Sequence, residues 1–74
     1  MHEVDTAALR YYMELSGIRT ILELSSKTNI NRNTLSGVLK GEIYPSSDVM
    51  TRIVGALNIP PDRAGQIFFK QKLA

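Results

Sequence analysis

The apolar residues of this chain recur at the spacing of helices. Leu9, Tyr12 and Met13 lie three or four positions apart, and a broader apolar stripe runs through residues 49–57. No segment alternates apolar and polar residues over five or more positions, and the Asn-Gly and Asp-Gly pairs typical of hairpin turns are missing. The pattern predicts an all-α fold without strands.

Capping residues divide the first half of the chain into two helices. The first is predicted from Thr6 to Ser16, with Asp5 or Thr6 as the N-cap and Gly17 as the stop. The sequence Thr20-Ile21-Leu22-Glu23 has the form of a capping box, so a second helix begins at about Thr20. It ends near Asn29, because asparagine tolerates the left-handed conformation of a sharp helix exit.

Three further helices follow. The third is predicted from about Asn31, as N-cap, to Lys40, with Gly41 just beyond it. Ser46 caps a fourth helix that ends at Asn58. Pro61 opens the last helix, which carries Ala64, Ile67 and Phe68 and has Lys70 and Lys72 at its C-terminal end.

Length and composition fit a small intracellular protein. The 74 residues predict one domain, 1–74, and the absence of cysteine excludes disulfides and thiolate metal sites. No apolar run approaches the ~20 residues of a membrane span, and the N-terminus is acidic where a secretory signal is basic. We therefore expect a soluble, cytoplasmic protein with no membrane partner.

Positive charge gathers in the middle of the chain. The net charge is +2, but between residues 19 and 40 four basic residues face one acidic residue, a local net charge of +3. The second and third helices meet there, separated by only two or three residues. Small Ser25 fits their closest approach, and this order of residues has the spacing of a helix-turn-helix at about residues 20–40. Six residues are predicted to share one core: Leu24, Ile30, Leu35, Val38, Ile53 and Leu57.

The run LSSKTNINRNTLSGVLKG, followed by Pro45-Ser46 and the segment IVGALNIP, resembles the Cro and CI repressor type of helix-turn-helix proteins. The resemblance covers the chain from about Leu9 to Phe68. It implies a fold of five short helices and sequence-specific binding of double-stranded DNA in transcriptional control. Regulators of this size in the family are typical of temperate-phage or prophage switches in bacterial hosts.

The resemblance also implies site residues. Arg32 and Asn33, with Ser36 one turn later, correspond to the positions that point into the major groove, and these residue types pair well with base edges. Contacts to phosphate are implied for Thr20, Lys27, Asn31 and Lys40. An interpretation without a binding function stays open. In it, asparagines 29 and 31 only cap helices, and the polar side chains of the third helix are exposed to solvent without contacting a partner.

Departures from the family pattern raise a second hypothesis. Ile21 and Leu22 stand where the family often has a phosphate-binding Gln, Gly37 stands at a base-facing position, and Glu42 would repel phosphate. Leu22, Leu39 and Ile43 predict a partly apolar surface beside the third helix. The alternative function is therefore an antirepressor, or modulator, that binds a phage repressor and blocks its DNA-binding surface.

Other functions are not supported by the residues. His2 has no cysteine or second histidine with which to share a metal, and it is a poor base for Ser25 or Ser26, so we expect neither enzyme activity nor a metal or other cofactor. We place His2 in a frayed N-terminus. Phe68, Phe69 and Leu73 hint at a homodimer surface near the C-terminus.

Overall fold

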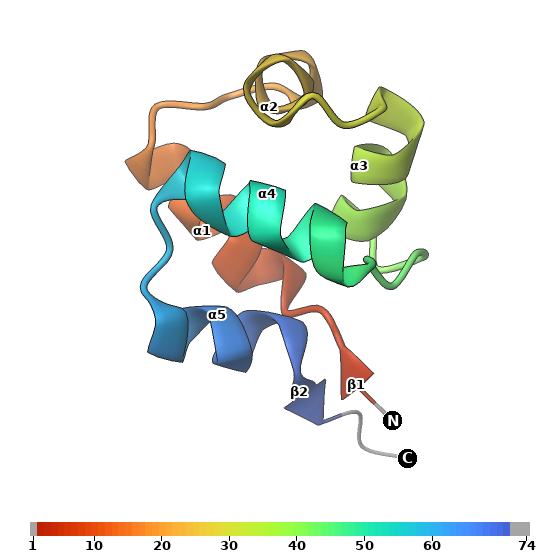
Figure 1. Ribbon diagram of the computed structural model, residues 1–74, viewed down its shortest axis with the longest axis vertical. Helices are drawn as coiled ribbons and strands as arrows, with labels where there is room; N and C mark the ends of the chain where they lie inside the picture. Colours follow the sequence, from red (N-terminus) through yellow and green to blue (C-terminus); the bar gives the residue numbers. More distant parts are fainter. Residues whose placement is uncertain (1, 72–74) are drawn as a thin grey trace.

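A computed structural model describes residues 2–71 of the chain. It contains five helices, which confirms the predicted helical architecture. Their bounds are α1 Thr6–Leu15, α2 Ile21–Thr28, α3 Arg32–Leu39, α4 Ser47–Leu57 and α5 Pro61–Phe68. In Figure 1, α2 and α3 lie at one end of the molecule, α5 lies at the other, and α1 and α4 lie between them. Within residues 2–71, the helices are too short or too polar to cross a bilayer.

Local capping sets where the helices begin and end. The Asp5 side chain accepts a hydrogen bond from the amide of Ala8, and Thr20 forms the predicted capping box with Glu23. Asn29 and Asn58 end α2 and α4 in the left-handed conformation, with φ of 57° and 52°. Because these contacts span only three or four residues, the predicted boundaries of the first four helices agree with the observed ones to within one or two residues.

The helices enclose one hydrophobic core. All six residues predicted to share it are buried, and they are joined by Leu39 of α3 and by residues from α1, α5 and the connecting segments. The additional buried hydrophobic residues are Val4, Leu9, Met13, Ile18, Leu39, Ile59, Ile67 and Phe68. Each helix therefore turns one face inward, as its apolar spacing predicts.

The expectation of no strands is wrong near the chain ends. Strands β1 (His2–Glu3) and β2 (Lys70–Gln71) pair antiparallel, with His2 opposite Gln71. Two residues are too few to display an alternating pattern, so the sequence carries no signal for them. His2 is thus paired rather than frayed, and its ring meets that of Phe69 edge-on at 5.5 Å between centroids.

The same strand pair changes the predicted end of the last helix. Helix α5 ends at Phe68, and Lys70 lies in β2 rather than on the helix. Lys72 and Leu73, which entered the predictions for the helix end and the dimer surface, lie outside the described residues. Figure 1 shows that the strand pair lies beside α5, at the end opposite α2.

Leu35 provides a test of this core. Its side chain is 0% exposed, so Leu35→Ala should lower the free energy of unfolding by ~2 to 5 kcal/mol, measured by urea denaturation. Leu22→Ala is the matched control, because Leu22 is 61% exposed and its truncation should change stability by less than about 0.5 kcal/mol. Equal effects of the two substitutions would contradict the burial of Leu35.

Candidate nucleic-acid interface

Helices α2 and α3 are joined by a turn of three residues. Asn29 reverses the chain in its left-handed conformation, and Ile30 sends its side chain into the core. Asn31 then caps α3, since its Oδ1 accepts a hydrogen bond from the amide of Asn33 at 2.7 Å. Each residue of the turn therefore has a structural role, and Asn31 stabilises the first turn of α3.

Two hydroxyl groups on α2 hold this turn. Ser25 Oγ donates to the carbonyl of Ile30 at 2.6 Å. Thr28, a buried polar residue, donates to the carbonyl of Leu24 at 2.7 Å and accepts from the amide of Ile30 at 3.3 Å. Both the amide and the carbonyl of Ile30 thus have hydrogen-bond partners within the protein.

Sequence reasoning identified only part of this arrangement. It explained Ser25 by its small size, and the structure adds a hydrogen bond to that explanation. It missed Thr28. The available signal was its position directly before the left-handed Asn29, where a threonine hydroxyl can bond to a backbone amide two residues later.

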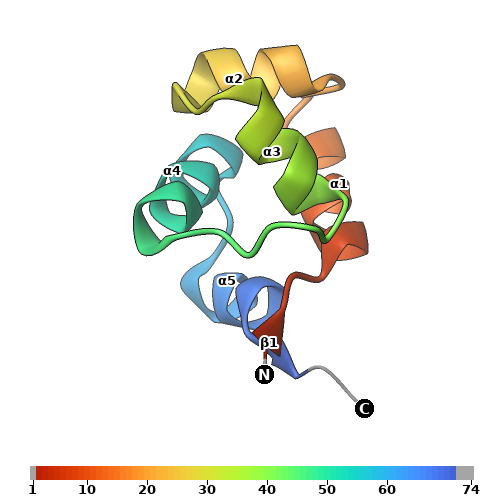
Figure 2. The same cartoon turned by 90° about the vertical axis from the view of Figure 1, so that its right-hand side faces the viewer.

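The outer side of α3 carries the predicted base-contacting residues. Arg32 and Asn33 are exposed, and Ser36 is half-buried one turn further along. These positions share one side of an eight-residue helix, opposite the buried Leu35 and Val38. Figure 2 looks towards α3, which crosses the front of the molecule below α2. The structure brings these three residues together on one stripe, in which Arg32 and Asn33 are exposed and Ser36 is half-buried, and exposed Lys40 continues it at the C-terminal end of the helix.

The predicted phosphate contacts are distributed around this stripe. Lys27 is exposed in the last turn of α2, and Asn31 is exposed at the start of α3. Thr20 is exposed too, but Glu23 already occupies its polar groups. The Glu23 carboxylate accepts from the amides of Arg19 and Thr20 at 3.0 and 3.1 Å and from the Thr20 hydroxyl at 3.2 Å. A carboxylate therefore lies at the α2 N-terminus, where a phosphate would have to approach.

Leu39 corrects one expectation. It was assigned to an apolar surface that contacts a partner, yet it is 2% exposed and belongs to the core. With Leu9 and Met13 of α1 it is enclosed in the same hydrophobic cluster. It cannot contact DNA or a protein partner while the chain is folded, so the expected apolar surface is reduced to Leu22 and Ile43, which are 61% and 43% exposed.

Gly37 corrects another expectation. It is buried rather than base-facing, because the loop after α3 folds back over it. The Gly37 carbonyl accepts from the amides of Glu42 and Ile43 at 2.8 and 3.1 Å. A Cβ at position 37 would lie 2.6 Å from Ile43 Cγ1, which is too close without movement. A glycine at position 37 therefore allows the loop to pack closely against α3. A side chain at this position could not reach a base, because the loop covers it.

Comparison with known proteins identifies the family to which a chain with this geometry belongs. A helix-turn-helix family model matches residues 9–63, which is most of the chain. The chain belongs to the Cro/CI-type helix-turn-helix family. No curated protein and no solved structure matched it. The helix-turn-helix family is a family of DNA-binding regulatory domains and not of enzymes. The matched residues include α2, the turn and α3, and exclude both strands.

Ser25 tests the geometry of the helix-turn-helix. Ser25→Ala removes the hydrogen bond to Ile30 and should lower the free energy of unfolding by ~0.5 to 1.5 kcal/mol. Ser25→Leu also adds volume to a half-buried site and should cost more, a further ~1 to 3 kcal/mol. Thermal unfolding of both variants measures the difference. Ser26→Ala is the control, because Ser26 is exposed and should tolerate the change.

Proposed function

We propose that this protein is a transcriptional regulator that binds operator DNA through α3, in a phage or prophage genetic switch in the cytoplasm of a bacterial host. The observation that carries this proposal is the pair of exposed residues Arg32 and Asn33 at the start of α3, with half-buried Ser36 one turn later, in a chain of the helix-turn-helix family. In this type of domain the N-terminal part of the second helix of the motif contacts base edges. No cofactor is needed for such binding.

Each residue has a role in this proposal. Arg32 pairs with guanine through two parallel hydrogen bonds, and Asn33 pairs with adenine in the same way. Ser36 contacts a base edge one turn later. Lys27, Asn31 and Lys40 contact phosphates on either side, with Thr20 at the margin of the interface because Glu23 occupies its amide. The local net charge of +3 in residues 19–40 attracts the duplex to this end of the molecule.

The second candidate function is an antirepressor that binds a phage repressor protein. Exposed Leu22 and Ile43 favour it, since apolar side chains on a polar surface are typical of protein contacts. Leu39 and Gly37 no longer support it, because both are buried. DNA binding through phosphates weakens steeply as salt increases, whereas an apolar protein interface does not, so salt dependence separates the two functions.

The proposal includes a homodimer, because regulators of this type read two half-sites one helical turn, ~34 Å, apart. Phe68 is buried in the core, so it lies beneath the proposed dimer surface and does not itself contact a second copy. A groove of about 380 Å³ lies over it, and Phe69, 53% exposed, lies at its edge. The other lining residues, from α4 and α5, are Met50, Thr51, Val54, Pro61, Ala64 and Gly65.

A groove with a half-exposed aromatic ring among its lining residues fits a two-fold dimer. In such a dimer the same patch is used by both copies, so a patch needs both a projection and a hollow to complement itself. Phe69 supplies the projection, and the mostly apolar groove between α4 and α5 supplies the hollow. Half of this surface comes from α5, which lies at the end of the molecule opposite α2 (Figure 1), and in the proposed dimer a second copy seated there leaves both recognition helices free.

Arg32→Ala tests DNA reading. Against a duplex selected from a randomised 20-base-pair library, the variant should lose ~1 to 3 kcal/mol of binding free energy and discriminate less at one base pair, measured by fluorescence anisotropy at two salt concentrations. Arg63→Ala on α5 is the control and should bind as the original chain does. Failure of the selection to enrich any sequence would count against operator binding.

Leu22→Lys tests the antirepressor function. A lysine at this exposed position preserves or strengthens attraction to DNA, but it places a charge in any desolvated protein contact there and should abolish binding to a repressor. Affinity capture from host cells with each form, followed by identification of the bound DNA or protein, provides the measurement. Capture of a helix-turn-helix protein that is lost on Leu22→Lys would replace the DNA-reading proposal.

Phe69→Ser tests the dimer. Because Phe69 is half-exposed and its ring meets only His2 among the aromatic contacts of residues 2–71, the fold should persist. Sedimentation equilibrium should show a weaker dimer by at least tenfold, about 1.4 kcal/mol. Tyr11→Ser on α1 is the matched control, also an exposed aromatic residue. Unchanged association of the Phe69 variant would rule out this surface.

A further inference from the structure

Two arginines outside the helix-turn-helix reach the ends of its helices. Arg10 of α1 donates from its Nη2 to the carbonyl of Leu39, the last residue of α3, at 3.0 Å. Arg52 of α4 donates from its Nη1 to the carbonyl of Thr28, the last residue of α2, at 3.4 Å. The two contacts are alike in chemistry although they come from different helices, 29 and 24 residues away in sequence.

A helix C-terminus is a suitable place for a cation. The last four carbonyls of a helix have no partner within it, and the aligned peptide dipoles place partial negative charge there. Helix α3 has no basic residue in its own last turn. Its other terminal carbonyls are satisfied by backbone amides: Ser36 by Lys40, Val38 by Gly41, and Gly37 by the loop. Arg10 completes the set at Leu39.

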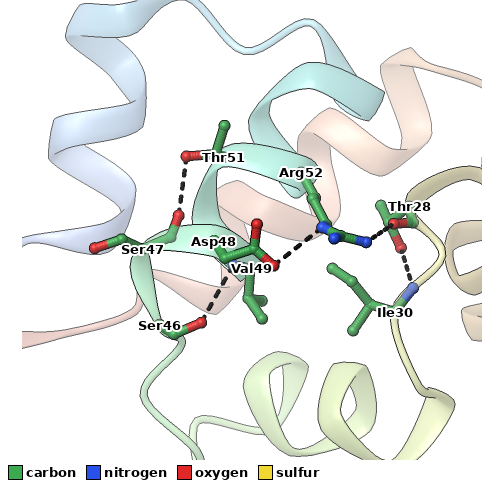
Figure 3. Close-up of polar contacts among 8 residues, drawn as sticks. All are labelled: Thr28, Ile30, Ser46, Ser47, Asp48, Val49, Thr51 and Arg52. Carbon is green, nitrogen blue, oxygen red and sulfur yellow. Dashed lines mark hydrogen bonds and ion pairs between the residues drawn. The ribbon is translucent and has the colours of Figure 1, made fainter.

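Arg52 is itself held in position. Its Nε lies 3.1 Å from Asp48 Oδ2, one turn earlier on α4, and Figure 3 shows the guanidinium between this carboxylate and Thr28. Thr28 in turn accepts from the amide of Ile30 through its hydroxyl. A chain of polar contacts therefore runs from α4 through the end of α2 into the turn that starts α3.

We propose that Arg10 and Arg52 are positioning residues that fix α3 at both ends and so set the direction in which Arg32 and Asn33 point. Arg52 links the end of α2, directly before the turn, to α4, and Arg10 links the far end of α3 to α1. A helix of eight residues held at both ends has little freedom to tilt. This inference rests on the proposed function for its effect on DNA binding, but the restraint itself belongs to the chain alone.

The competing interpretation treats both arginines as further phosphate ligands of a basic protein. Salt dependence distinguishes the two roles. Loss of one phosphate contact lowers the slope of log affinity against log salt by ~0.9, whereas a positioning residue lowers affinity and leaves the slope as it was. Arg10→Met and Arg52→Met are suitable variants, because methionine keeps an unbranched apolar stem and removes the donors.

The experiment measures binding of each variant to the duplex selected from the randomised library, at four salt concentrations, with circular dichroism to confirm folding. Each Met variant should bind DNA more weakly, by up to about 10-fold, because binding must then supply the ordering of α3 that the lost hydrogen bond provided, and the salt slope should be unchanged. Arg10→Lys and Arg52→Lys keep a cationic donor and should restore part of the affinity. Arg63→Met, on α5, is the matched control and should leave affinity unchanged.

Amide hydrogen exchange without DNA separates this inference from the proposed function. In the Met variants, the amides of Ile30 and Asn33 in and after the turn, and of Lys40 at the far end, should exchange at least threefold faster, while those within α5 should not change. If the original chain binds no DNA, the proposed function fails and exchange alone decides the restraint. Unchanged exchange, unchanged affinity, or a slope reduced by ~0.9 would each overturn the positioning role.

Discussion

The three-residue turn between α2 and α3 is the constraint on which the other features of this end of the molecule depend. A chain that reverses so quickly needs one left-handed residue, and Asn29 supplies it. It also leaves the amide and the carbonyl of Ile30 without a partner in a helix, so the hydroxyls of Thr28 and Ser25 bond to them instead. Because Ile30 is buried, the turn is fastened to the core and to α2 at once.

These contacts within the turn leave the terminal carbonyl groups of α2 and α3 to be hydrogen-bonded by groups from other parts of the chain. The loop after α3 folds over Gly37, where the absence of a side chain lets Ile43 approach, and it satisfies the Gly37 carbonyl. Arg10 and Arg52 provide cations from α1 and α4 to the last carbonyls of α3 and α2. The short helices of the motif are thus stabilised by their neighbours more than by their own length, as expected for helices below about 12 residues.

The accuracy of the sequence-based predictions follows the range of the interactions behind them. Caps act over three or four residues, so Thr20 with Glu23, Asn29 and Ser46 could be recognised from sequence alone. Core positions followed from helical spacing, and the six predicted ones are buried. Leu39 and Gly37 were assigned wrongly because their burial depends on α1 and on a loop that folds back, which the spacing within one helix does not reveal. The roles of the exposed α3 residues remain proposals, since exposure alone does not specify a ligand.

Glu23 shows how one interaction can support the fold and limit the site. Its carboxylate completes the capping box, which stabilises α2, and it does so by occupying the amides of Arg19 and Thr20. The N-terminus of a helix attracts phosphate through such amides and through its partial positive charge. A carboxylate already bound there occupies two amides and offsets part of the partial positive charge, so it reduces the attraction for a phosphate at this end of α2. In the proposed function, electrostatic attachment of DNA then depends on Lys27 and Lys40, and specificity on the stripe that begins at Arg32.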